Sequence, residues 1–76
     1  PHDGAVGILT ITPGESAIIA GDIATKAGEV RIGFLDRFTG ALTITGDVAS
    51  VTSSMKAISE YFETVLGYAP SPLTKS

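Results

Sequence analysis

Hydrophobic and polar positions alternate in three short segments of the chain. Residues 5–12 are apolar at nearly every position until the last ones, which predicts a central strand covered on both faces. Apolar residues then recur at every second position, first at Val30, Ile32 and Phe34 and again at Leu42 and Ile44. These patterns predict two further strands, which a tight polar turn joins.

That turn is the segment Asp36–Gly40, and it is short enough to connect two antiparallel strands as a hairpin. Gly40 is expected to take a positive φ angle there, which glycine adopts at no steric cost. From composition alone the segment reads as an ordinary hairpin turn, so any functional role must come from elsewhere.

Two helices are predicted between and after these strands. The first begins with Thr12 as its N-cap, Pro13 in the first turn and Glu15 closing a capping box, and it ends at Gly28. Its face toward the sheet is expected to consist of mostly small residues: Ile19, Ala20, Ile23, Ala24 and Ala27.

The second helix is predicted over residues 48–66, with Asp47 as its N-cap and Gly67 as its end. Its apolar residues recur every three or four positions: Val48, Val51, Met55, Ile58, Phe62, Val65 and Leu66. Met55, Ile58 and Phe62 are therefore expected to face the sheet, whereas Lys56 and Glu60 lie on the opposite side. Thr52–Ser54 is assigned to the polar side as well.

The predicted order β-α-β-β-α describes an α+β domain, a ferredoxin-like fold that lacks its last strand. Pro70 and Pro72 argue against the tail as an inner strand, because proline cannot donate to a β-ladder. The fourth strand is accordingly expected from outside this sequence.

Composition limits what such a chain can do alone. Its 76 residues make one domain, 1–76, and it has no cysteine that could form a disulfide or a thiolate metal site. Charged residues are 17% of the chain, against about 25% in typical soluble domains, while 43% are apolar. This excess of apolar residues predicts oligomerisation.

The charge balance and hydropathy pattern exclude some partners. A net charge of −3 with five Lys and Arg argues against nucleic acid, which requires a clustered basic surface. No apolar run approaches the roughly 20 residues of a membrane span, and no secretion signal is visible. We therefore expect neither nucleic acid nor membrane as a partner, and the cytoplasm as the location.

No residue pattern indicates catalysis. His2 has no second histidine or cysteine to share a metal with, and no base accompanies the serines of residues 52–54. Two acidic pairs lack the spacing and apolar setting that would separate their pKa values, namely Glu60 with Glu63 and Glu15 with Asp22. Neither a P-loop nor a dinucleotide-binding pattern occurs. We expect no enzyme, and no catalytic, cofactor-binding or metal-binding residue.

Three segments nevertheless resemble a known family: residues 4–15 (GAVGILTITPGE), 24–28 (ATKAG) and 33–42 (GFLDRFTGAL). They are similar to bacterial microcompartment shell proteins, most of all to the circularly permuted, single-domain kind of ethanolamine, propanediol and choline utilisation. The ending 73–76 (LTKS) resembles the ethanolamine type. The resemblance covers essentially all 76 residues, and the block LDRFTGAL is its most specific part.

The resemblance implies a cyclic hexamer that tiles, with other shell proteins, the wall of a metabolic organelle around an aldehyde-producing pathway of the ethanolamine or choline type. It implies that the turn of Asp36, Arg37, Phe38, Thr39 and Gly40 lines a narrow or occluded central pore. Because six copies of Arg37 around one axis would repel one another, we expect Asp36 to pair with Arg37, within or between subunits, and to hold the shape of the turn. It also implies that Lys26 lies at the hexamer edge, although Lys26 equally suits a solvated position near a helix C-terminus. In the permuted kind, an N-terminal segment often forms a small barrel over the pore. That segment, with one strand and one helix, is expected to be absent here.

Two functions from different classes follow. The chain is a structural shell subunit, or it is an oligomeric ferredoxin-like regulator that holds a small ligand between subunits. The hairpin is too short to supply the long loop or phosphate-binding nest that the second requires. A third possibility extends the first, with encapsulated enzymes docking through amphipathic helical peptides.

Overall fold

The structure is a computed structural model that describes the backbone of residues 4–66 and 71–75 and the side chains of residues 4–64. Its elements follow in chain order: β1 (Ala5–Thr10), α1 (Ser16–Ala27), β2 (Arg31–Asp36), β3 (Ala41–Gly46), α2 (Val48–Tyr61), a π-helical turn (Phe62–Leu66) and β4 (Ser71–Lys75). The predicted α+β fold is confirmed. The predicted end of the second helix, Gly67, lies outside the described residues, and so do Pro70 and His2.

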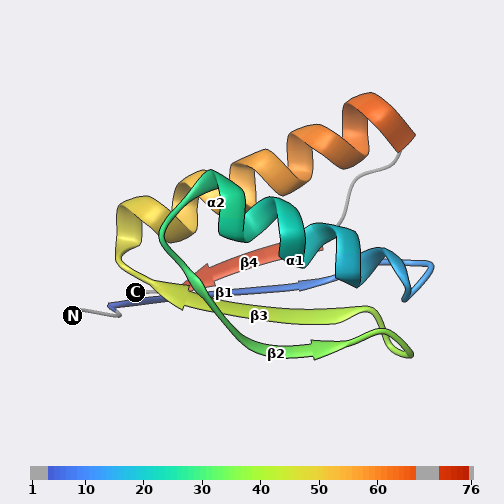
Figure 1. Ribbon diagram of the computed structural model, residues 1–76, viewed down its shortest axis with the longest axis horizontal. Helices are drawn as coiled ribbons and strands as arrows, with labels where there is room; N and C mark the ends of the chain where they lie inside the picture. Colours follow the sequence, from blue (N-terminus) through green and yellow to red (C-terminus); the bar gives the residue numbers. More distant parts are fainter. Residues whose placement is uncertain (1–3, 67–70, 76) are drawn as a thin grey trace.

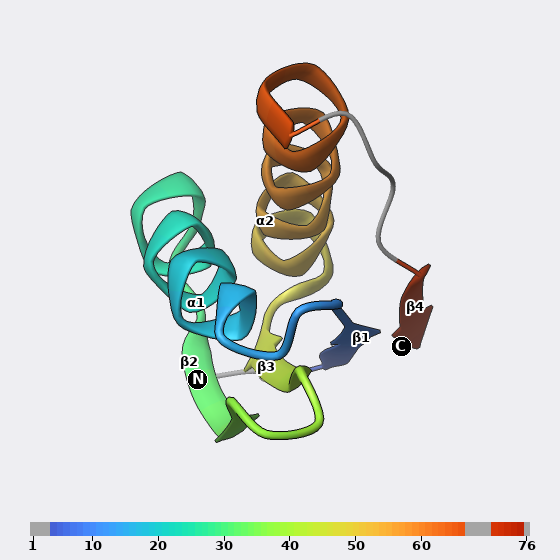
Figure 2. The same ribbon diagram turned by 90° about the vertical axis from the view of Figure 1, so that its right-hand side faces the viewer.

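All four strands form one antiparallel sheet in the order β2-β3-β1-β4. Both helices lie side by side on one face of this sheet, and none of the described residues forms a helix on the opposite face (Figures 1 and 2). β1 is an inner strand, as predicted, but within the described chain only one of its faces is covered.

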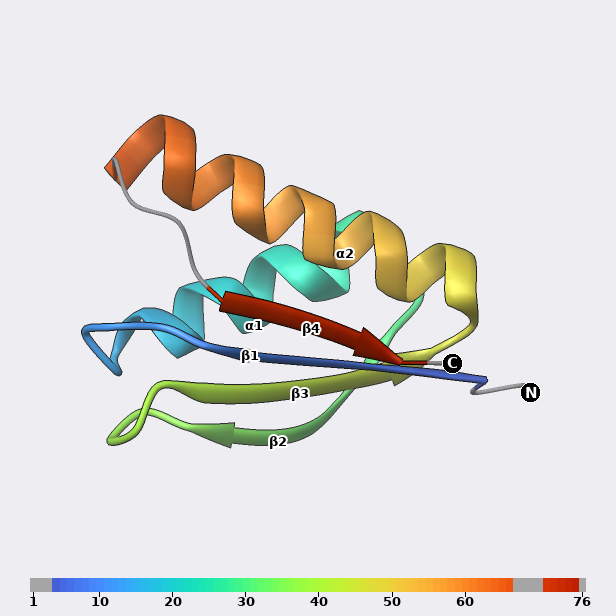
Figure 3. The ribbon, with the colours of Figure 1, turned by 180° about the vertical axis from the view of Figure 1, so that it is seen from behind.

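The prediction that the fourth strand comes from outside the sequence is wrong. The tail itself supplies it, because β4 pairs with β1 at the edge of the sheet (Figure 3). Pro72 stands opposite Leu9 in this pairing. An edge strand tolerates proline because one side of its backbone has no neighbour in the sheet, so the proline argument excluded only an inner position.

α1 begins later than predicted, at Ser16. The amides of Ser16 and Ala17 donate to the backbone carbonyl groups of Pro13 and Gly14, at 3.0 and 2.9 Å. The predicted N-cap at Thr12 is therefore wrong. The helix ends at Gly28 as predicted. Its buried face is also rotated from the prediction, because Ile19 and Ala27 are exposed whereas these residues are buried: Ser16, Ala17, Ala20, Gly21 and Ala24.

α2 matches its predicted beginning. The carboxylate of Asp47 accepts the amide of Ser50 at 2.6 Å, which confirms the N-cap. Met55, Ile58 and Phe62 are buried and Lys56 is exposed, as expected from the helical spacing.

The hydrophobic core lies between the sheet and the two helices. Its members alternate along β1 and β3 and recur along one side of each helix: Ala5, Leu9, Ile11, Ala20, Ala24, Leu42, Ile44, Val51, Met55, Ile58 and Phe62. The ring of Tyr61 meets that of Phe62 edge-on at a centroid distance of 5.2 Å. Val48, assigned to the apolar face from sequence, is 48% exposed.

Candidate functional site

The turn Asp36–Gly40 connects β2 to β3 and lies at one end of the molecule (Figure 1). The carboxylate of Asp36 accepts two hydrogen bonds, from the backbone amide of Phe38 at 2.9 Å and from the hydroxyl of Thr39 at 3.0 Å. The hydroxyl oxygen of Thr39 in turn accepts the amide of Ala41 at 3.3 Å. The turn is therefore closed by its own side chains.

These contacts stabilise the charged form of Asp36. The amide of Phe38, and after it the hydroxyl of Thr39, lower the pKa of this carboxyl group below its ordinary value of 3.8. Asp36 is consequently ionised at neutral pH, where it holds the turn closed.

Two glycines fix the turn against the loop that leads into α1. Gly40 has a φ of +81°, and a Cβ atom there would lie 1.8 Å from the carbonyl oxygen of Ile11. A Cβ atom at Gly14 would lie 2.1 Å from the carbonyl oxygen of Arg37. The amide of Ile11 also donates to the carbonyl of Gly40 at 2.9 Å. The positive φ of Gly40 was predicted, whereas the packing of Gly14 was not, since sequence spacing does not show this contact.

At the tip of the turn, Phe38 is 86% exposed. The guanidinium of Arg37 lies over its ring, 5.5 Å from the centroid, which is within the range of a cation–π contact. The two side chains and Glu15 line an open depression of about 380 Å³. An Asp36–Arg37 pair was predicted to hold the turn. Within the chain this is wrong, because Phe38 and Thr39 occupy the carboxylate and Arg37 contacts the ring.

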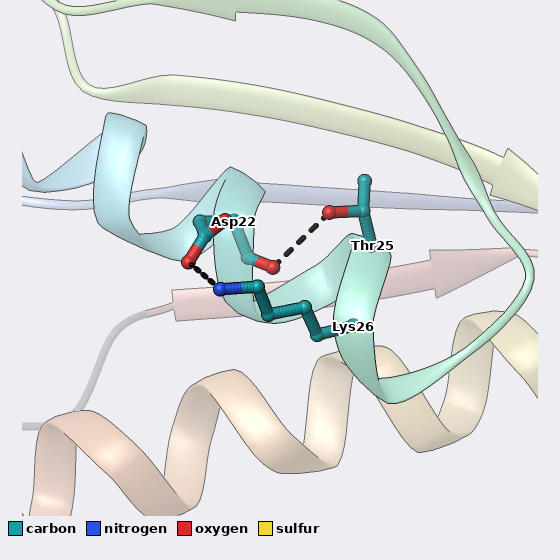
Figure 4. A network of polar contacts seen from close by, with 3 residues as sticks. All are labelled: Asp22, Thr25 and Lys26. Carbon is teal, nitrogen blue, oxygen red and sulfur yellow. Dashed lines mark hydrogen bonds and ion pairs between the residues drawn. The ribbon is translucent and has the colours of Figure 1, made fainter.

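Lys26 lies in the last turn of α1, far from the turn between β2 and β3. Its ammonium group is 3.0 Å from the carboxylate of Asp22, one helical turn earlier, and both side chains are largely exposed (Figure 4). The hydroxyl of Thr25 donates to the backbone carbonyl of Asp22 at 3.1 Å. The pair is an ordinary surface contact at i and i+4, so Lys26 remains accessible on the outside of the helix.

Ser54 was assigned to the polar side of α2, and this is wrong. It is fully buried, and its hydroxyl donates to the carbonyl oxygen of Ala24 at 2.7 Å. Ser54 follows Val51 by three positions, so it belongs to the buried stripe of the helix by spacing. Its polar type concealed that position.

Candidate chemistry elsewhere is sparse. Among the side chains that the structure describes, no group of three or more His, Cys, Asp or Glu could hold a metal ion. Neither of the described helices is long and apolar enough to cross a membrane. The residues singled out from sequence thus fall into two separate places, the turn and the outer end of α1.

Comparison with known proteins decides the family. The BMC domain model matches residues 5–72. The chain belongs to the BMC-domain family. Its relatives are shell proteins of bacterial microcompartments, so this BMC-domain chain is a microcompartment shell protein, located in a shell within the cytoplasm.

Three relatives show the degree of similarity. The microcompartment shell protein CutR of Streptococcus intermedius is 52% identical over 75 residues, 99% of this chain and 65% of CutR. EutS of Escherichia coli K12 is 50% identical over the whole chain and 68% of its own length. PduU of Salmonella typhimurium is 50% identical over 95% of the chain and 62% of its own length. The chain thus spans about two thirds of these relatives.

Solved structures of CutR resemble the structure of this chain. A CutR flat hexamer superposes with a TM-score of 0.85 at 48% identity, over 91% of this chain and 59% of the CutR chain. A CutR screw with a 33.8 Å pitch superposes with a TM-score of 0.83, over 90% of this chain and 69% of the CutR chain. A domain-swapped CutR dimer gives 0.86, over all of this chain and 77% of the CutR chain.

Proposed function

We propose that the protein is a non-catalytic building block that forms cyclic hexamers and tiles a microcompartment shell. The observation that carries this proposal is the similarity to the CutR flat hexamer, at a TM-score of 0.85 and 48% identity. A heterologous interface closes into a ring only at the right rotation per subunit, and otherwise it produces a screw. CutR has been solved in both arrangements.

The chain's own surface supports assembly. Among the side chains of residues 4–64, seven large apolar ones are exposed, and they lie on the sheet, on both helices and on the turn: Ile8, Ile18, Ile19, Ile32, Phe34, Phe38 and Val48. So many exposed apolar side chains on a domain of this size favour contacts with further copies.

We infer that the turn Asp36–Gly40 lines the central pore and leaves it narrow or occluded. Its closure by Asp36 and its packing against the loop before α1 present Phe38 and Arg37 outward in a fixed position. Six exposed rings around one axis would form an apolar constriction, which gates by dewetting. Six guanidinium groups would repel one another, and the stacking of each over its own Phe38 ring turns it aside.

We assign the hexamer edge to the outer end of α1, with Lys26 as its central residue. The side chain is accessible, and its partner Asp22 lies on the same helix, so a neighbouring hexamer can approach without breaking the fold. Replacing Lys26 by glutamate would place a second negative charge beside Asp22. It would also bring negative charges together where two hexamers meet. We expect the hexamers to persist and their sheets to be lost.

For the interior, we propose an aldehyde-producing pathway of the ethanolamine or choline type, supported by the likeness to EutS and CutR. Enzymes of that pathway would dock on the shell through amphipathic helical peptides, whose apolar face requires an exposed apolar surface.

The experiment that tests the assembly uses the full-length protein in size-exclusion chromatography with light scattering, followed by electron microscopy of concentrated samples. A mass of six subunits and two-dimensional sheets are expected. A monodisperse monomer at high concentration would overturn the proposal.

A further inference from the structure

The open depression beside the turn between β2 and β3 brings together two groups of opposite charge. It has a volume of about 380 Å³ and is lined by Glu15, Arg37 and Phe38. Glu15 directly precedes α1, whereas Arg37 and Phe38 belong to the turn. Two segments that are distant in the sequence therefore form its walls, and a single chain supplies all three side chains.

The positive charge in the depression is not neutralised by the neighbouring acid. The carboxylate of Asp36 already accepts the amide of Phe38 at 2.9 Å and the hydroxyl of Thr39 at 3.0 Å. Among the described residues no ion pair joins Arg37 to Asp36 or to Glu15. One carboxylate and one guanidinium thus flank the depression without contacting each other.

The exposed pair on α1 shows the opposite situation. Asp22 and Lys26 meet at 3.0 Å, so the two charges satisfy each other and leave no space for a ligand between them. The depression differs because its two charges come from separate segments that hold them apart. A molecule from solution can therefore bridge them.

The contact of Arg37 with Phe38 leaves the hydrogen-bond donors of the guanidinium available. Its carbon atom Cζ lies over the ring, 5.5 Å from the centroid. A guanidinium that stacks on a ring turns its flat face to that ring, and its N–H groups point outward in its own plane. There they can donate two parallel hydrogen bonds to a carboxylate.

Close packing fixes the two walls relative to each other. A Cβ atom at Gly14 would lie 2.1 Å from the carbonyl oxygen of Arg37, and the amide of Ile11 donates to the carbonyl of Gly40 at 2.9 Å. The loop before α1 and the turn are consequently held together. A site that is already ordered loses less conformational entropy when a ligand binds.

We propose that the depression binds a small zwitterion with one ammonium and one carboxylate group, the charge pattern of an amino acid. The carboxylate of the ligand accepts hydrogen bonds from Arg37, its ammonium group donates to Glu15, and its methylene groups contact the ring of Phe38. A molecule with a single charge would contact only one of the two charged groups. The depression is open to water, so binding is weak, with a Kd of about 1 mM or more.

This site goes beyond the proposed role as a building block, and it does not require the ring. If the turn lines the central pore as proposed, six such sites surround the opening. A bound zwitterion then lies beside each Phe38 ring, so the subunit holds a solute where the opening is narrow.

The test is saturation-transfer NMR on the full-length protein, with 4-aminobutyrate as the zwitterion. Butyrate and butylammonium are the matched probes, because each keeps the chain and one of the two charges. We expect 4-aminobutyrate to bind at least about threefold more tightly than either, the gain that one exposed ion pair provides.

Two variants assign the charges. Glu15→Gln should lower the affinity for 4-aminobutyrate to that of butyrate and leave butyrate binding unchanged. Arg37→Gln should lower it to that of butylammonium and leave butylammonium binding unchanged. Lys26→Gln, which removes a charge of the separate pair on α1, should change none of the three affinities. Circular dichroism should show that all variants fold.

The outcomes separate this inference from the proposed function. Equal binding of butyrate and 4-aminobutyrate by the wild-type protein would overturn it, since the site would then bind any anion. It would also be overturned if no probe binds, or if Glu15→Gln keeps the preference for the zwitterion. Light scattering on the same samples gives the assembly state. A hexamer that binds no zwitterion overturns this inference alone, whereas a monomer that binds it overturns only the proposed hexamer.

Discussion

The hydroxyl of Ser54 donates to the carbonyl oxygen of Ala24 at 2.7 Å, across a sequence distance of 30 residues. Both residues are fully buried, so the bond joins α2 to α1 where no water reaches. The same carbonyl accepts the amide of Gly28, at 3.3 Å, where α1 ends. One acceptor thus connects the end of the first helix with the middle of the second.

Ser54→Ala removes the donor and leaves a small void beside the carbonyl of Ala24. We expect a loss of about 1–3 kcal/mol in the free energy of unfolding, the usual effect of removing a buried hydrogen-bond partner. Urea denaturation measures it. Ser53→Ala, at the exposed neighbouring position, should change stability by less than about 0.5 kcal/mol. Equal effects at the two positions would contradict the importance of the buried bond.

Gly40→Ala tests the packing of the turn. A methyl group there meets the carbonyl oxygen of Ile11, and the residue has a φ of +81°, so the loop must move. We expect a destabilisation of about 1–3 kcal/mol or more. Gly33→Ala is the matched control, because its nearest contacts would be 3.7 Å away, an ordinary distance. Thermal unfolding that shows the two variants alike would disprove the close approach.

Phe62→Ala should cost about 3–5 kcal/mol in unfolding free energy, because the ring is fully buried and truncation leaves a cavity. Lys56→Ala and Glu60→Ala, on the exposed side of α2, should stay within about 0.5 kcal/mol. Denaturant melts of the three variants compare the two faces. Similar midpoints for all three would mean that the helix is oriented wrongly.

The turn should open only at a pH below 3.8, the ordinary pKa of an aspartate side chain. Hydrogen bonds lower the pKa of Asp36 in the folded state. The stability that ionised Asp36 gives to the turn is therefore fully present above pH 3.8, the ordinary pKa of the group, and it is lost as the pH falls through the lowered pKa. The amide resonance of Phe38 should therefore stay constant from neutral pH down to about 4 and shift only below it. Asp36→Asn should speed exchange of that amide at neutral pH. A titration midpoint above 3.8 would contradict the assignment.

Local patterns were sufficient to predict most of the fold. Alternation located β2 and β3, helical spacing located the buried residues of α2, and Asp47 marked the start of that helix correctly. Each of these signals depends on residues close together in sequence. The resemblance of the segment 33–42 to shell proteins predicted the family, which the BMC domain match confirms.

Two of the errors concern contacts between distant segments, and another concerns the path of a single turn. Whether Pro72 ends a strand or lies in an edge strand depends on which strand it meets, and the tail's own pattern does not contain that information. Ser54 was misplaced because its polar type suggested an exposed position, and the acceptor that allows its burial is 30 positions away. The partner of Asp36 depends on the exact path of the turn, which brings Phe38 and Thr39 to the carboxylate before Arg37.

The pore-lining role of Asp36–Gly40 and the edge role of Lys26 remain predictions, since both depend on neighbouring subunits. Electron cryomicroscopy of the assembled full-length protein tests the central claim most directly. We predict six copies in a ring, with the turns Asp36–Gly40 converging on the symmetry axis and Phe38 narrowing the opening. A ring in which these turns lie on the outer rim, away from the axis, would contradict the account.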